Sequence, residues 1–174
     1  MDNNFKCDYM RSTNDSEFNV IHFIKDYVFY HRIRYMYHFR KAARGSLYSK
    51  VKLYLYSRKY GIEIKASTKI GKAFVMIHPY NITVSPYAVI GENVTMMKGS
   101  TVGLGKGGAP TVGNKVYIGI NSTVIGKINV GNDVLIAPNT MVNVDVPDHS
   151  VVIGNPCKII HKDNATQDYI WKIY

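Results

Sequence analysis

The chain has 174 residues, of which 46% are hydrophobic, and its formal net charge is +10, so its length suits one domain with an appendage. No apolar run approaches the roughly 20 residues that a membrane-spanning helix needs, and the opening Met1–Asn4 does not resemble a signal peptide. Cys7 and Cys157 are far apart and lack the spacing of metal ligands. We therefore expect a cytoplasmic protein with no structural disulfide and no bound metal.

The first part of the chain, residues 1–60, is rich in basic and aromatic side chains. Residues 17–60 contain ten Lys and Arg but only two acidic residues. Gly45–Ser46 predicts a break between a first helix and a second one over 47–60, which Gly61 ends. The helical spacing predicts that one face is shared by Phe18, Ile21, Ile24, Val28, Tyr35 and Phe39.

Three interpretations of this basic segment remain open. The favoured one is an aromatic-rich helical cap whose Lys and Arg side chains are solvated. The second is contact with a membrane surface, because Tyr and Trp suit the interface and basic residues attract anionic headgroups. The third, nucleic-acid binding, finds no recognised motif in support, so we expect no nucleic-acid partner.

From residue 64 to residue 146 aliphatic side chains recur every six residues. The series runs through Ile64, Ile70, Val84, Ile90, Met96, Val102, Val112, Ile118, Val124, Val130, Ile136 and Val142. Second inward candidates, four residues after the members of the last run, are Val116, Ser122, Ile128, Val134, Thr140 and Val146. A fixed period of six is typical of a parallel β-helix built from hexapeptides.

A stack of β-helical coils has two open ends that need covering. The non-repeating flanks, 1–60 and 160–174, are the candidate caps, and the tail from Asp163 through Trp171 to Tyr174 is predicted to form a short helix.

The six-residue step fails at two places. Two extra residues lie between Ile70 and Val84, in a segment that contains His78–Pro79. Four extra residues lie between Val102 and Val112, in a glycine-rich excursion. Insertions at the corners of a solenoid commonly re-aim a side chain, so both places are candidate functional features.

The repeat, the His78 segment, the glycine-rich excursion and the ending Val146–Lys158 together resemble the hexapeptide acyltransferases. Within them, the chain is most similar to the serine O-acetyltransferase branch and its polysaccharide-modifying relatives. The resemblance covers about 61–160. It implies a mainly β fold, a left-handed β-helix over 61–159, with a helical segment before it and a capping tail over 160–174. It also implies a homotrimer, acetyl-CoA as the donor and active sites between subunits.

The resemblance implies catalytic roles for His78 and Glu63. In the family a histidine after the first coil is the general base, and an acidic residue fifteen positions earlier orients it; Glu63 stands where serine acetyltransferases usually have Asp. Removing the hydroxyl proton as oxygen attacks a thioester suits an imidazole near neutral pH, and a carboxylate would stabilise the imidazolium.

The resemblance also indicates residues for the donor. Backbone N–H groups near Gly103 and Leu104 could face the oxyanion of the tetrahedral intermediate. The corner residues expected along pantetheine, and the lysine expected at the nucleotide phosphate, are Gly119, Ile120, Ala137, Pro138, Asn143 and Lys158. A glycine at a corner is also needed by the fold itself.

The chain departs from the serine branch where that branch binds its amino acid. Ile77 replaces an Asp, and Ala109–Thr111 replaces the charged end of the glycine-rich loop. The acceptor predicted from these losses is a neutral saccharide hydroxyl of a polysaccharide or lipid-linked precursor, reached at the inner face of the membrane. Serine acetylation in cysteine biosynthesis is the alternative within enzymes, and a non-catalytic β-helix scaffold is the alternative of another class.

Overall fold

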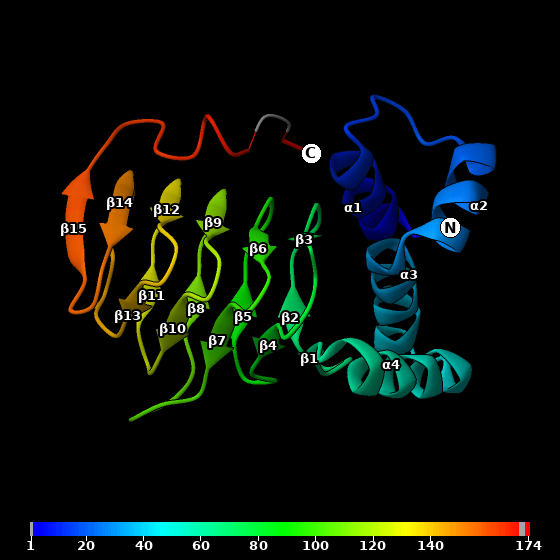
Figure 1. Ribbon diagram of the computed structural model, residues 1–174, viewed down its shortest axis with the longest axis horizontal. Helices are drawn as coiled ribbons and strands as arrows, with labels where there is room; N and C mark the ends of the chain where they lie inside the picture. Colours follow the sequence, from blue (N-terminus) through cyan, green and yellow to red (C-terminus); the bar gives the residue numbers. More distant parts are fainter. Residues whose placement is uncertain (1, 171–172) are drawn as a thin grey trace.

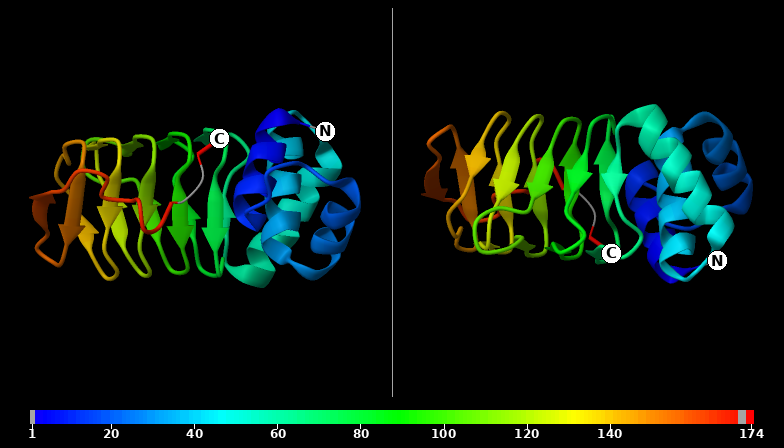
Figure 2. Two further views of the ribbon diagram at one scale, coloured as in Figure 1. Left: turned by 90° about the horizontal axis from the view of Figure 1, so that it is seen from above. Right: turned by 90° about the horizontal axis from the view of Figure 1, so that it is seen from below.

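The structure is a computed structural model that describes residues 2–170 and 173–174. Four helices form one end of an elongated molecule, and a parallel β-helix forms the rest (Figures 1 and 2). The helices are α1 (Asn3–Thr13), α2 (Val20–Phe29), α3 (His31–Ala43) and α4 (Leu47–Tyr60). Among the described residues, no helix has both the length and the apolar character needed to cross a bilayer.

Polar caps explain where these helices begin. The side chains of Asp2, Asn19 and Ser46 accept hydrogen bonds from backbone N–H groups in the first turns of α1, α2 and α4. Gly61 ends α4 in the left-handed conformation, as its position predicts. The residues before Gly45 form three helices instead of the predicted single one. The backbone of Tyr30 is extended and separates α2 from α3.

The prediction of a single apolar face across these helices is wrong. Tyr35 and Phe39 of α3 are buried, whereas Ile21, Ile24 and Val28 of α2 are exposed. Periodicity identified an apolar stripe in each helix, but the change of direction at Tyr30 lets only one of the two stripes reach the core.

The predicted parallel β-helix is confirmed, with three sheets forming the faces of a prism. The first sheet contains β1 (Glu63–Ile64), β4 (Thr83–Val84), β7 (Thr101–Gly103), β10 (Thr123–Ile125) and β13 (Met141–Val142). The second contains β2 (Lys69–Ile70), β5 (Val89–Ile90), β8 (Thr111–Val112) and β11 (Asn129–Val130). The third contains β3 (Val75–Ile77), β6 (Thr95–Met97), β9 (Val116–Ile118), β12 (Val134–Ile136), β14 (Ser150–Ile153) and β15 (Lys158–His161).

The inward positions of the repeat fill the prism. From Val84 to Val142 every aliphatic member of the series is at most 3% exposed, and Ser122 and Thr140 take their inward places beside them. Ile70 alone in the series is only partly buried. This core continues into the helices, because Phe5, Tyr35 and Phe39 belong to the same cluster of buried side chains.

Helices α1 and α3 cover the open end of the first coil with polar contacts as well as apolar ones. The Arg11 guanidinium donates to the carbonyl oxygens of Ala73 and Val94, at 2.5 and 3.0 Å. Arg40, buried in α3, forms a two-pronged ion pair with Asp8 of α1, at 2.8 and 3.0 Å. Arg11 thereby supplies a donor to the carbonyl of Ala73 in the first coil, while the carbonyl of Val94 in the second coil also accepts the Val75 amide, at 3.0 Å.

The other end of the stack closes differently. β15 turns back and pairs antiparallel with β14, so the parallel ladder stops there. The tail then runs along the outside of the β-helix toward the helices (Figure 1). The short helix predicted for this tail is not found in its described part: residues 163–169 form turns, while Trp171 and Lys172 lie outside the described residues.

Candidate active site

The register of the coils locates the first insertion at His78–Pro79. Glu63 pairs with Thr83, twenty residues on, whereas Thr83 pairs with Thr101, eighteen residues on. Ile77 still pairs with Met97, and the amide of Gly99 already bonds the carbonyl of Tyr80, at 2.9 Å. The two residues without a counterpart in the next coil are therefore His78 and Pro79.

The backbone at His78 is unusual even within this fold. Most non-glycine residues with positive φ lie in two columns at the corners, one through Ala73, Asn93, Lys115, Asp133 and His149, the other through Asn81, Asn121 and Asn139. His78 has a φ of 49° and, among the described residues of the coils, is the one that belongs to neither column. A left-handed conformation costs a non-glycine residue on the order of 1 kcal/mol. The result is an exposed imidazole that stands out from the corner between the third and first sheets.

An aromatic cluster from the helical segment supports this bulge. The ring of His31 stacks on Tyr60 at 4.4 Å and lies 5.0 Å from the ring of Tyr80. Burial lowers the pKa of His31, and the adjacent backbone of Pro79 opposes this shift only in part. A neutral His31 thus packs behind the segment that carries His78. The position of His31 in a basic helix did not predict that it packs against the segment that carries His78.

Glu63 lies at the start of β1, just beyond the same corner, and its side chain is exposed. Within the described part of the chain, no hydrogen bond or ion pair joins it to His78. Glu63 instead lines a cavity of about 460 Å³ between α4 and the first two coils. Lys50, Lys65 and Ser85 also line this cavity, so its wall carries charges of both signs.

Several of the predicted donor residues follow one edge of the prism. Gly119–Ile120 and Ala137–Pro138 come directly after β9 and β12, at the corner where His78 follows β3. Lys158 opens β15 opposite Ile153, at the same end of the third sheet. Since neighbouring strands are about 4.8 Å apart, this edge runs roughly 24 Å from His78 to Lys158. The fold itself also requires glycine at position 119, because a Cβ there would meet the backbone nitrogen of Pro138 at 2.7 Å.

The glycine-rich excursion lies on a different edge. Gly103 ends β7, and the chain then forms a small hairpin in which Gly105 and Gly108 bond each other, at 3.0 and 3.3 Å. Leu104 is 56% exposed. Asn143, after β13, shares this corner between the first and second sheets. One copy of the chain therefore does not bring Gly103 and Leu104 to His78.

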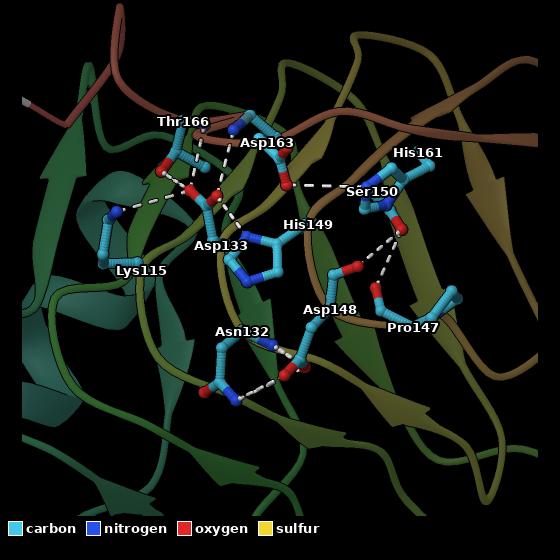
Figure 3. Close-up of polar contacts among 11 residues, drawn as sticks. Lys115, Asn132, Asp133, Pro147, Asp148, His149, Ser150, His161, Asp163 and Thr166 are labelled. Atoms are coloured by element: carbon cyan, nitrogen blue, oxygen red, sulfur yellow. Dashed lines mark hydrogen bonds and ion pairs between the residues drawn. The ribbon is translucent and has the colours of Figure 1, made fainter.

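A second polar cluster surrounds Asp133 (Figure 3). Its buried carboxylate accepts hydrogen bonds from the Thr166 hydroxyl at 2.7 Å and the Ala165 amide at 3.0 Å. The imidazole of His149 lies 2.9 Å away and the ammonium of Lys115 lies 3.4 Å away. These contacts hold the tail against the corner and explain its turns, because the amides of Ala165 and Thr166 point at a side chain instead of closing a helical turn. In the described residues no group of His, Cys, Asp or Glu is arranged to hold a metal ion.

The Asp133→Ala variant is expected to release the tail and to lower the free energy of unfolding by about 2 kcal/mol, because buried donors lose a charged acceptor. Faster hydrogen exchange at the Ala165 and Thr166 amides would report the release. Asp163→Ala, which removes an exposed carboxylate of the same tail, serves as the control. Equal hydrogen-exchange rates at these two amides in both variants would contradict the role of Asp133 in holding the tail.

The same contact predicts an acid-sensitive tail. Burial alone would raise the pKa of Asp133, but the hydrogen bonds from Thr166 and His149 and the charge of Lys115 outweigh it and hold this pKa well below its ordinary value of 3.8. The stabilisation is therefore fully present above about pH 4 and is lost as the pH falls from there toward the depressed value in the folded state.

No family model matches the chain. Among curated proteins, it is similar to a serine acetyltransferase of Helicobacter pylori, with 38% identity over 107 residues, which are 59% of this chain and 63% of that protein. A serine acetyltransferase of Staphylococcus aureus is 35% identical over 109 residues, 60% of this chain and 51% of that protein. The chain thus spans less than two thirds of the length of these relatives.

Solved structures extend the similarity to the helices. A serine acetyltransferase of Entamoeba histolytica, isoform 3 in complex with cysteine, matches 94% of this chain and 62% of its own, with a TM-score of 0.72 and 26% identity. The serine acetyltransferase of Neisseria gonorrhoeae matches 97% of this chain and 68% of its own, with a TM-score of 0.72 and 25% identity. The resemblance to the hexapeptide acyltransferases is confirmed.

The prediction of a saccharide acceptor is wrong. The curated relatives and the solved structures that resemble the chain are serine acetyltransferases, and they do not support a closer likeness to polysaccharide-modifying enzymes. The error came from treating the loss of charged residues at Ile77 and Ala109–Thr111 as a loss of the ability to bind an amino acid as the acceptor.

Proposed function

We propose that the protein is an acetyl-CoA-dependent O-acetyltransferase whose acceptor is serine. The observation that carries this proposal is the exposed imidazole of His78, which a two-residue insertion sets on the edge occupied by the predicted donor residues. The similarity to serine acetyltransferases, over helices and β-helix together, supports the reaction and the acceptor.

His78 would act as the general base in this reaction. Its imidazole takes the proton of the serine hydroxyl while the oxygen attacks the thioester carbonyl. The tetrahedral intermediate then collapses: the carbon–sulfur bond breaks, the sulfur of CoA receives the proton from His78, and the products are O-acetylserine and CoA. Glu63, from the same corner, would favour the transient imidazolium through its negative charge.

The donor would lie along the edge that leads away from His78. Pantetheine would pass Gly119 and Ala137, which add little side-chain bulk to this edge, and Lys158 at the far end offers a cation to a phosphate. The backbone near Gly103 and Leu104 would complete the site from a second copy of the chain, because within one copy it lies on another edge. A trimer with its sites between subunits satisfies this requirement.

Serine would meet its charges in the cavity beside Glu63. The residues that hold the ammonium and carboxylate groups in the serine branch are replaced at Ile77 and Ala109–Thr111. The 460 Å³ cavity has a carboxylate at Glu63 and an ammonium at Lys65, the two charges that a zwitterion needs. Glu63, at the start of β1, is at the end of this cavity nearer the His78 corner, whereas Lys65 and Ser85 lie beyond the far ends of β1 and β4.

The test is an assay of the purified protein with acetyl-CoA and L-serine. Release of the CoA thiol is followed with a thiol reagent, and O-acetylserine is identified by mass spectrometry. We expect thiol release and O-acetylserine to appear in equal amounts, and the rate without serine to be only that of donor hydrolysis. Thiol release that is independent of serine at millimolar concentration would refute the proposed acceptor.

A further inference from the structure

Two of the four helices leave apolar faces without a partner. On α2 and at its end, the exposed apolar side chains are Val20, Ile21, Ile24, Val28, Phe29 and Tyr30. On α4 they are Leu47, Tyr48, Val51, Tyr54 and Leu55. The spacing on α4 places its five residues in one stripe along the helix. Isolated apolar side chains on a surface are ordinary, but two continuous stripes indicate a binding face.

The two stripes belong to the same region of the molecule. A hollow of about 350 Å³ separates α2 from the start of α4, and Ile24, Val28 and Tyr48 line it. Because α4 ends at the first coil, its Leu47 end points away from the β-helix, toward the end of the molecule where α2 lies (Figures 1 and 2). We call the exposed residues of α2 and α4 given above the apolar helix face.

Positive charge surrounds the apolar helix face. Four of the ten basic residues of this segment bond other parts of the chain, namely Arg32, Arg34, Arg40 and Arg44. The remaining six are Lys25, Lys41, Lys50, Lys52, Arg58 and Lys59, and none of these forms an ion pair within the described residues. The segment has only two carboxylates, and that of Asp26 already accepts the Tyr9 hydroxyl at 2.8 Å.

We propose that the apolar helix face binds the surface of a bilayer that contains anionic lipid. The apolar side chains of α2 and α4 enter the boundary between headgroups and acyl chains, and the six uncompensated cations contact the headgroups. Tyr30 and Tyr48 suit this depth, since their rings are apolar and their hydroxyl groups stay near water. The β-helix then projects from the membrane, with its edges open to the aqueous side.

Charge favours a lipid surface over a second copy of the chain. Two copies meeting through this face would bring twelve like charges together, because each contributes the same six cations and the stripes themselves carry no carboxylate. An anionic bilayer has the opposite charge and can cover both stripes at once.

The experiment is sedimentation of the purified protein with vesicles of phosphatidylcholine, with and without phosphatidylserine. We expect binding to the anionic vesicles only, and a weaker partition as the salt concentration rises. Lys25→Glu combined with Arg58→Glu should weaken the partition by roughly tenfold or more, and Ile21→Ser combined with Leu55→Ser should weaken it at any salt concentration.

The matched control is Lys69→Glu combined with Lys98→Glu, the same charge change at two exposed lysines of the β-helix. This variant should bind vesicles nearly as well as the unchanged protein, and circular dichroism should show that all variants are folded. Three results would overturn the proposal: no binding to anionic vesicles, equal loss in the control, or a molar mass in solution that falls when the apolar helix face is altered. Serine acetylation in solution is measured separately, so failure here leaves the proposed reaction standing.

Discussion

The His78→Ala variant is expected to lose acetyl transfer to serine by about 10³-fold in kcat while it stays folded. The expected size follows from the usual contribution of a positioned general base. His78 is exposed and lies in an insertion outside the ladder of strands, so its side chain contributes little to the core. The KM for acetyl-CoA should change little, because the predicted donor contacts lie in later coils. Steady-state kinetics with thiol detection measures both quantities.

The matched control for this variant is His22→Ala, which removes an exposed imidazole on α2, far from the bulge. It should keep full activity. If His78→Ala also kept full activity, His78 would not be the base. If neither the unchanged protein nor the variants transferred acetyl groups, while other binding properties survived, the non-catalytic scaffold would be the better description.

The Asp8→Ala variant is expected to lower the free energy of unfolding by about 3–5 kcal/mol, the range found when a buried ion pair loses one partner. The carboxylate of Asp8 receives two bonds from Arg40 and one from the backbone N–H of Phe74, at 2.9 Å. The same guanidinium donates to the carbonyl groups of Ile70 and Gly71, at 2.7 and 2.5 Å. Without Asp8, a buried cation remains unpaired between the helices and the first coil.

Chemical denaturation with urea measures this loss, and Glu92→Ala is the control. Glu92 forms an ion pair with Lys72 at 3.9 Å in which the two side chains are 51% and 35% exposed, so its loss should cost less than about 1 kcal/mol. Adding Arg40→Ala to Asp8→Ala should cost less than the sum of the single changes, because the orphaned charge is then removed. Similar costs for Asp8→Ala and Glu92→Ala would show that the buried pair does not hold the two parts together.

The β-helix could be predicted from the sequence because its stability is local. Each coil buries residues against the coil above and below it, so the demand for an aliphatic residue returns every six positions. From the sequence, the insertion could be located only to the interval between Ile70 and Val84. The six-residue period does not show which residues within a broken repeat are the extra ones. The pairing of Ile77 with Met97 was needed to identify His78 and Pro79 as the inserted residues.

The arrangement of the helices could not be predicted in the same way. An apolar stripe such as Ile21, Ile24 and Val28 has the same spacing whether it meets a core or a partner outside the chain. The contacts that determine how the helices are arranged join residues far apart in the sequence, as Asp8 joins Arg40 and the first coil. Asp133 is a similar case: it occupies an ordinary corner of the repeat, and its partner Thr166 follows 33 residues later.

The tail also changes how the coils depend on one another. In a linear stack, each coil touches only its neighbours, so either end can fray while the other remains intact. Here Tyr174 contacts the helical end of the stack. Its backbone N–H donates to Asn93 at 2.9 Å, and its hydroxyl donates to the carbonyl of Asp15 at 2.5 Å. Opening the final coil therefore disturbs contacts beside the first, which favours a single cooperative transition over stepwise unravelling.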